Sequence, residues 1–457
     1  MKVSTSGRRL SVRQLVIAAV AALLVIGAAP AGVAEAEEPT TWFVDESKLP
    51  FDPIPGVPAA QYWGIVGTAG FRAEVPENWN GELVMWAHGF RGEGLELTVD
   101  NHPIRQHLLE RGYAWAASSY ERNSYDVLTG VESTKALVDH VNAEILAHEA
   151  GRVYMTGASM GGHVTAVSIE KYHEVYHGAM PICGVLGSYE LFDFFLDYML
   201  GAQQLVFGEA EFPLSDLGEW YGETVPTMKE RFSAVPGGFP FLLSEEGEQF
   251  KAMVEWQTGG PRPNFDEAFA FWHGFDSGTG FGNFLFDLGI GDGTLPNSNG
   301  LSVVENNRTR YRLDGTRQLD MREERVLNRE IPRYSFDRGA RSTGESITGR
   351  IRDRVLSLHN LGDLFVPFEM ERDYAYRVRN QGRSNRLVQR AIRGSGHCDF
   401  TQYELTTAFD DLTNWVETGV RPAGDNVLSA REVASDDFGC RFSDPDHTLH
   451  QFATPCD

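Results

Sequence analysis

The chain has 457 residues, of which 42% are hydrophobic and 23% charged, a composition typical of a globular protein with a sizeable core. The length suits one large domain or two of ordinary size. The net charge of −24 at pH 7 argues against nucleic acid and anionic membrane surfaces as partners, because both repel an acidic protein.

Residues 1–36 have the pattern of a signal peptide. Basic residues between Lys2 and Arg13 precede an apolar run from Leu15 to Ala29, and Ala34–Ala36 fits a small-x-small cleavage site. The alternative is an uncleaved N-terminal anchor. No later stretch approaches the ~20 apolar residues that a membrane-spanning helix needs. We therefore expect a secreted protein, extracellular or periplasmic, without stable membrane anchoring after signal cleavage.

Short apolar runs then alternate with helical patterns. The predicted strands are a pair within 62–75, then 82–88, 113–120, 152–156, 178–183, 354–358 and 387–392. The predicted helices are 127–148, 161–175, 367–379 and 401–417. Alternation of this kind predicts the α/β class, with a mostly parallel sheet and helices on both of its faces.

The alternation fails between about Gly187 and Arg350, where Phe, Gly and Trp are frequent. One apolar helix is expected around Phe192–Tyr198, and a loop with buried aromatic residues at 281–293. Because structureless loops of this length are rare, we predict an inserted cap or lid at 187–350. The core would comprise 37–186 and 351–422, and a polar tail would follow at 423–457.

Gly157–Gly161 forms a G-x-S-x-G motif around Ser159. Alone the motif is weak, but here it follows a predicted strand and opens a predicted helix, which is the setting of a nucleophile elbow. The glycines allow a strained turn to present the serine while backbone packs closely on both sides. The alternative is an ordinary glycine-rich turn.

A nucleophilic serine needs a base, and the base needs a carboxylate that orients it. His397 follows the last predicted strand in a glycine-rich loop, and Asp363 follows the strand before it. Asp353 and Asp373 are the rival carboxylates, one before that strand and the other inside the next helix.

The tetrahedral intermediate of acyl transfer needs two N–H donors directed at its oxyanion. The N–H of Met160, directly after the serine, is one candidate. The N–H of Phe90, in the His88-Gly89-Phe90 loop after the strand at 82–88, is the other. His88 itself would brace this loop.

These motifs, in the order Ser159, Asp363 and His397, resemble the α/β-hydrolase superfamily over about 62–183 and 354–422. The resemblance implies acyl-transfer chemistry without a metal or an organic cofactor. GHCDF, which contains His397, and the later NWVETGVRP are also similar to the end of secreted feruloyl-esterase and tannase-like enzymes.

Four cysteines in an exported chain favour disulfides, and three pairings are possible. In feruloyl-esterase and tannase-like enzymes a cysteine beside the serine is linked to one beside the histidine. Here Ala158 precedes the serine, so that Cys183, at the end of the neighbouring strand, is the substitute. In an α/β-hydrolase sheet Cys183 and Cys398 would both lie near the catalytic centre, while Cys440 and Cys456 lie together in the tail, so the resemblance implies the pairs Cys183–Cys398 and Cys440–Cys456. A free, buried Cys183 is the alternative.

The sequence thus predicts a secreted serine hydrolase that cleaves small-molecule or polymeric carboxylic esters through an acyl-enzyme. An exported serine peptidase or amidase with the same triad is the first alternative. A non-catalytic binding protein on the same fold is the second.

Overall fold

The computed structural model describes residues 41–212, 216–274, 286, 304–313, 318–335, 345–446, 450 and 452–456. These residues belong to one compact unit, Thr41–Asp457. The predicted signal peptide lies outside the described residues, and so does the predicted aromatic loop at 281–293 except for Phe286.

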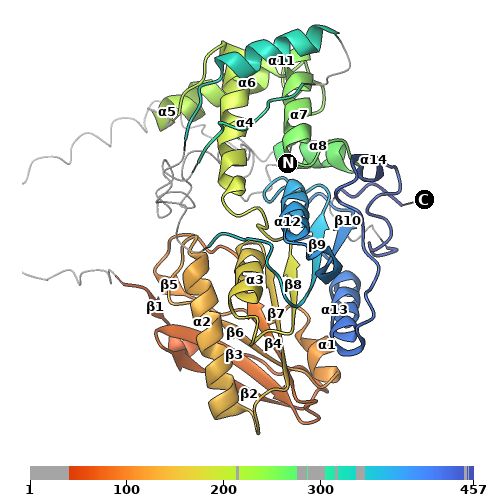
Figure 1. Cartoon of the computed structure of the whole chain (residues 1–457). Helices are drawn as coiled ribbons and strands as arrows, with labels where there is room; N and C mark the ends of the chain where they lie inside the picture. Colours follow the sequence, from red (N-terminus) through yellow and green to blue (C-terminus); the bar gives the residue numbers. More distant parts are fainter. Residues whose placement is uncertain are drawn as a thin grey trace, which may run out of the picture. The chain divides into compact units, whose positions relative to one another are not determined.

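A sheet with the order β10-β9-β8-β7-β4-β6-β3-β2 forms the centre of the unit (Figure 1). Its strands are β2 (Ala59–Val66), β3 (Ala69–Pro76), β4 (Glu82–Ala87), β6 (Ala114–Ser118), β7 (Arg152–Ala158), β8 (Gly178–Ile182), β9 (Arg354–Asn360) and β10 (Leu387–Ile392). From β6 to β10 all neighbours are parallel, whereas β3 runs antiparallel to both β6 and β2. The predicted mostly parallel sheet is confirmed. A separate parallel pair joins β1 (Phe43–Val44) to β5 (Glu96–Leu97).

Helices cover both faces of this sheet, as predicted. One face packs against α2 (Val127–His140), α3 (Met160–Lys171) and α12 (Glu369–Asn380), and the other against α1 (Arg105–Glu110) and α13 (Gln402–Thr418). A π-helical turn, Val141–Ile145, extends α2. Strands β4, β6, β8 and β10 are buried along their whole length, which explains the apolar runs of β4, β6 and β8; in β10 the buried residues include Gln389 and Arg390.

The insertion between β8 and β9 is helical, and its described residues add no strand to the central sheet. Its helices are α4 (Glu190–Phe207), α5 (Leu217–Glu219), a π-helical turn (Trp220–Thr224), α6 (Val225–Arg231), α7 (Glu245–Gln257), α8 (Phe265–Gly274) and α11 (Gln318–Glu330). Figure 1 shows them gathered at one end of the sheet, with α4 leading into the group. Buried residues of the insertion, such as Phe192 and Phe250, are continuous with the core of the sheet.

The C-terminal segment packs closely against the core, which differs from a simple polar tail. It contains a short helix, α14 (Ala430–Val433), and a disulfide between Cys440 and Cys456. The buried guanidinium of Arg393, just after β10, donates to the Phe438 carbonyl at 2.9 Å. This segment is therefore fixed beside the loop that follows β10.

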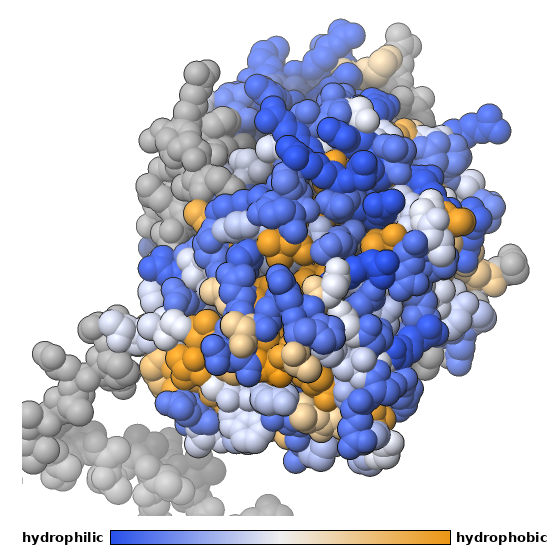
Figure 2. All heavy atoms as spheres, turned by 60° about the horizontal axis from the view of Figure 1, so that its bottom comes forward, coloured by the Kyte–Doolittle hydropathy of each residue, from blue (hydrophilic) through white to orange (hydrophobic). Residues whose placement is uncertain are grey.

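The visible surface in Figure 2 is mostly hydrophilic, with hydrophobic residues gathered in the lower half of the view. Within the described part of the chain, no helix combines the length and apolarity that crossing a membrane would require.

Candidate active site

Ser159 occupies a strained turn between β7 and α3. Its φ is 59° and its ψ is −124°, a conformation that costs a non-glycine residue ~1–3 kcal/mol and turns the serine out of the strand direction. A Cβ at Gly157 would lie 2.4 Å from the Gly161 carbonyl oxygen, and one at Gly161 would lie 2.1 Å from that of Ala87. Close backbone packing thus requires both glycines of the motif.

The loop after β4 passes directly beside this serine. A Cβ at Gly89 would lie 3.2 Å from Ser159 Cβ and 3.6 Å from Oγ, so only a glycine leaves this approach unhindered. Met160 begins α3 and is buried, and Phe90 is half-buried. The oxyanion roles of the Phe90 and Met160 N–H groups stay a prediction.

His88 supports the same loop from within the core. Its ring stacks on Tyr120 with 3.9 Å between centroids, and the Tyr120 hydroxyl donates to the His88 carbonyl at 3.0 Å. Burial, followed by the charge of Arg91, lowers the pKa of His88 to about 4. His88 is therefore neutral at pH 7, and its packing fits the predicted bracing role.

Asp363 and His397 meet at the carboxyl ends of β9 and β10. Asp363 Oδ2 lies 2.6 Å from His397 Nδ1, and Asp363 Oδ1 accepts the N–H groups of Phe365 and Val366 at 2.9 and 3.0 Å. The carboxyl of Asp363 is fully buried. Of the three carboxylates weighed from the sequence, Asp363 is the one in contact with His397: Asp353 precedes β9, and Asp373 lies on α12.

A disulfide holds the histidine loop beside the serine turn. The Ser159 N–H donates to the Ile182 carbonyl at 3.0 Å, the next residue is Cys183, and Cys183 is bonded to Cys398. His397 Nε2 lies 3.4 Å from Cys398 Sγ, and within the described residues no hydrogen bond joins Nε2 to Ser159 Oγ. Such bonds often form only once substrate is bound. The two disulfides of the structure are the pairs that the resemblance implied.

The ligand atoms of Cys183, His397 and Cys398 lie within 4.8 Å of one another, which is a spacing suited to a metal ion. The two sulfurs are bonded to each other, however, and neither is available as a thiolate ligand.

Residues of the insertion hold the loops that carry Asp363 and His397, and sequence reasoning missed them. The Trp272 indole N–H is 2.9 Å from the carbonyl of Gly362, beside Asp363, and 2.8 Å from that of Ser395, two residues before His397. Asn264 donates to Ser395 Oγ at 2.9 Å. No local signal separates Trp272 from the other aromatic residues of the insertion, because its role depends on contacts 90 and 123 residues away.

The C-terminal segment joins the same network. Ser395 Oγ donates to the Phe452 carbonyl at 2.9 Å, and Thr454 Oγ1 donates to Asn264 Oδ1 at 3.1 Å. The loop that carries His397 is thus held by the insertion, by the tail and by the disulfide to Cys183.

Aromatic side chains connect His397 to the insertion. The Phe365 ring meets the His397 ring edge-on at 5.1 Å and stacks on Phe195 of α4 at 6.1 Å. These rings offer an apolar surface beside the histidine. A cavity of about 720 Å³ lies elsewhere, and neither Ser159 nor His397 lines it.

The order of the sheet, its antiparallel edge strands and the strand–serine–helix turn define an α/β-hydrolase fold. No protein family model matches the chain. It is 21% identical to an o-phthalyl amidase of Xanthobacter agilis over 420 residues, which cover 81% of this chain and 91% of the amidase.

Similar solved structures include feruloyl esterase B from Aspergillus oryzae, with 15% identity and a TM-score of 0.43, covering 86% of this chain and 89% of the esterase. Another esterase from Aspergillus oryzae is 12% identical with a TM-score of 0.46, covering 80% of each chain.

Proposed function

We propose that this chain is an exported serine hydrolase that cleaves carboxylic esters through an acyl-enzyme intermediate. The observation that carries the proposal is the combination of a strained serine turn and a buried Asp363–His397 pair, joined by the Cys183–Cys398 disulfide. A catalytic role explains why strain and a buried carboxylate are maintained at one place.

In the proposed reaction, Ser159 Oγ attacks the ester carbonyl while His397 Nε2 accepts the hydroxyl proton. The N–H groups of Phe90 and Met160 stabilise the oxyanion. His397 then donates the proton to the leaving alcohol. A water molecule, deprotonated by His397, attacks the acyl group, and His397 returns that proton to Ser159 Oγ as the acid leaves. Asp363 holds the Nδ1–H of His397 and stabilises the imidazolium that forms.

Amide hydrolysis is the second candidate, and the similarity to an o-phthalyl amidase favours it. The same groups serve both reactions, because only the leaving group differs. A phthalic acid monoester and the matched phthalic acid monoamide distinguish the two. We expect the ester to have the higher kcat/KM, and a higher kcat/KM for the amide would overturn the ester assignment.

Export is also part of the proposal. Two disulfides fit an oxidising compartment, and the predicted cleavage site follows Ala36. N-terminal sequencing of the protein recovered outside the cytoplasm should begin at Glu37. An intact N-terminus would indicate the anchor alternative.

A further inference from the structure

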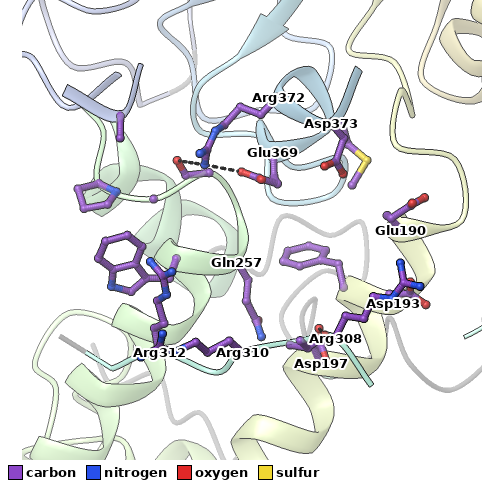
Figure 3. A pocket seen from close by; sticks show the side chains of 18 of the residues that line it. Glu190, Asp193, Asp197, Gln257, Arg308, Arg310, Arg312, Glu369, Arg372 and Asp373 are labelled. Atoms are coloured by element: carbon purple, nitrogen blue, oxygen red, sulfur yellow. Dashed lines mark hydrogen bonds and ion pairs between the residues drawn. The ribbon is translucent and has the colours of Figure 1, made fainter. Parts of the chain in front are cut away.

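The cavity of about 720 Å³ lies between α4, α12 and the extended segment 304–313 (Figure 3). We call it the charged cavity, because acidic and arginine side chains dominate its lining. Its volume is in the range of small-molecule sites. Because it is separate from the catalytic residues, its role does not depend on the proposed function.

Arginines form one wall of the charged cavity. Arg308, Arg310 and Arg312 all line the cavity from this segment, as does Thr309, and Arg310 also lies 3.5 Å from the carboxylate of Glu324. The segment is fixed: Tyr311 is fully buried and donates its hydroxyl to Asp197, and the Leu313 N–H donates to Glu324. Arg312 lies over the Trp256 ring at 4.8 Å. These contacts hold the arginine-bearing segment in place.

Carboxylates of α12 form the opposite wall. Glu369 pairs with Arg372 at 2.7 Å, whereas Asp373 has no hydrogen bond or ion pair with any described residue. Burial, reinforced by the charges of Glu369 and Glu190, raises the pKa of Asp373 to about 7. The charges of Arg377 and Arg372 act in the opposite direction but do not outweigh burial.

Gln257 lies between the two walls. Both polar atoms of its amide, and Nε of Arg372, are buried without a hydrogen-bond partner among the described residues. Figure 3 shows Gln257 between Glu369 and Asp373 on one side and Arg308 and Arg310 on the other. Unpaired buried groups of this kind cost free energy unless a ligand satisfies them.

We propose that the charged cavity binds a small zwitterion, either an α-amino acid or a short peptide with free ends. Asp373 and Glu369 would hold its ammonium group. Arg308 and Arg310 would hold its carboxylate, and Gln257 would bond to its polar backbone. The lining carries both signs, with arginines on the segment 304–313 and carboxylates on α4 and α12, so a zwitterion can pair with both sets, whereas a ligand with a single charge can pair with only one.

Calorimetry on the Ser159→Ala variant tests the proposal, since that variant would not hydrolyse a bound peptide. The probes are the dipeptide phenylalanyl-alanine, its N-acetyl derivative and its C-terminal amide. We expect saturable binding of the free dipeptide, and binding weaker by about tenfold or more for each blocked form.

Asp373→Asn and Arg308→Gln should each weaken dipeptide binding by about tenfold. The matched controls are Asp139→Asn on α2 and Arg325→Gln on α11, which are both exposed and outside the cavity. Each should leave dipeptide binding unchanged. Without ligand, Asp373→Asn should keep or raise the melting temperature, because it removes an unpaired charge.

Three results would overturn the proposal. The first is no binding of the free dipeptide at millimolar concentration, and the second is equal binding of the blocked forms. The third is a lower melting temperature of the ligand-free Asp373→Asn or Arg308→Gln variant, which would mean that these side chains stabilise each other within the protein.

Discussion

Asp363 shows how one side chain determines the state of another. One of its oxygens faces His397 Nδ1 and the other is fixed by two backbone N–H groups, so the carboxylate cannot rotate without losing a bond. This arrangement selects the histidine tautomer whose Nε2 is free to accept a proton.

Replacing Asp363 by Asn should lower kcat by about 10⁴-fold with little change in fold, because the amide would favour the wrong tautomer. Hydrolysis of a p-nitrophenyl ester measures the effect. Asp353→Asn, at the other end of β9, is the control and should keep full activity. An Asp363→Asn enzyme with a tenth of the wild-type kcat would exclude the proposed role.

For individual residues, the sequence alone was enough to name candidate site residues wherever the chemistry depends on a local pattern. The serine motif, the glycine-rich loop of His397 and the position of Asp363 after a strand are visible within a few residues. Asn264 and Trp272 could not be predicted, since only the folded chain brings them to loops 90 to 131 residues away.

Among the elements, α8 contacts both loops that carry the proposed acid and base. Its Trp272 offers one N–H to two carbonyls, and that shared donor sets the distance between the loops. The Gly362 N–H also donates to the Gly394 carbonyl at 2.9 Å, so the loops are joined directly as well.

Trp272→Phe keeps an aromatic ring and removes this donor. We expect kcat to fall by about tenfold with KM little changed, because the catalytic groups lose alignment while the apolar surface remains. Trp220→Phe is the matched control, since its indole N–H donates at 3.1 Å to Phe286 within the insertion. Equal losses of kcat in the two variants would indicate general destabilisation instead.

The helices of the insertion were mostly missed for a physical reason. In α8 the buried residues Phe265, Ala268, Phe269, Trp272 and His273 do recur at helical spacing, but Ala270 and Phe271 on the less buried face are apolar too, so the contrast between the two faces is weak. In α11 the apolar residues do not mark the buried face, because Met321 and Val326 are both exposed. The core strands were predictable because burial on both faces leaves apolar runs.

For the whole molecule, the C-terminal segment completes the fold around the histidine loop. His450 is buried, with Nε2 2.9 Å from Glu404 and Nδ1 3.6 Å from Asp399, two residues after His397. Burial opposes its protonation, but these two carboxylates outweigh burial and raise the pKa of His450 to about 10. That the insertion acts as a cap or lid stays a prediction.

This pKa predicts how stability depends on pH. His450 binds its proton more tightly in the folded state, so its stabilising effect is complete below its unfolded pKa of about 6.5 and is lost as pH rises toward 10. His450→Gln should therefore lower the melting temperature by a few degrees at pH 6 and by much less at pH 10. A difference that grows with pH would show that His450 is neutral in the folded protein.

The most direct measurement is labelling with a fluorophosphonate probe, followed by peptide mapping of the modified residue. Ser159 should react, and Ser159→Ala should not. His397→Gln should react at least 10³-fold more slowly, because the serine then lacks its base. Labelling of another serine, or unchanged labelling in Ser159→Ala, would contradict the assignment of Ser159 as the nucleophile.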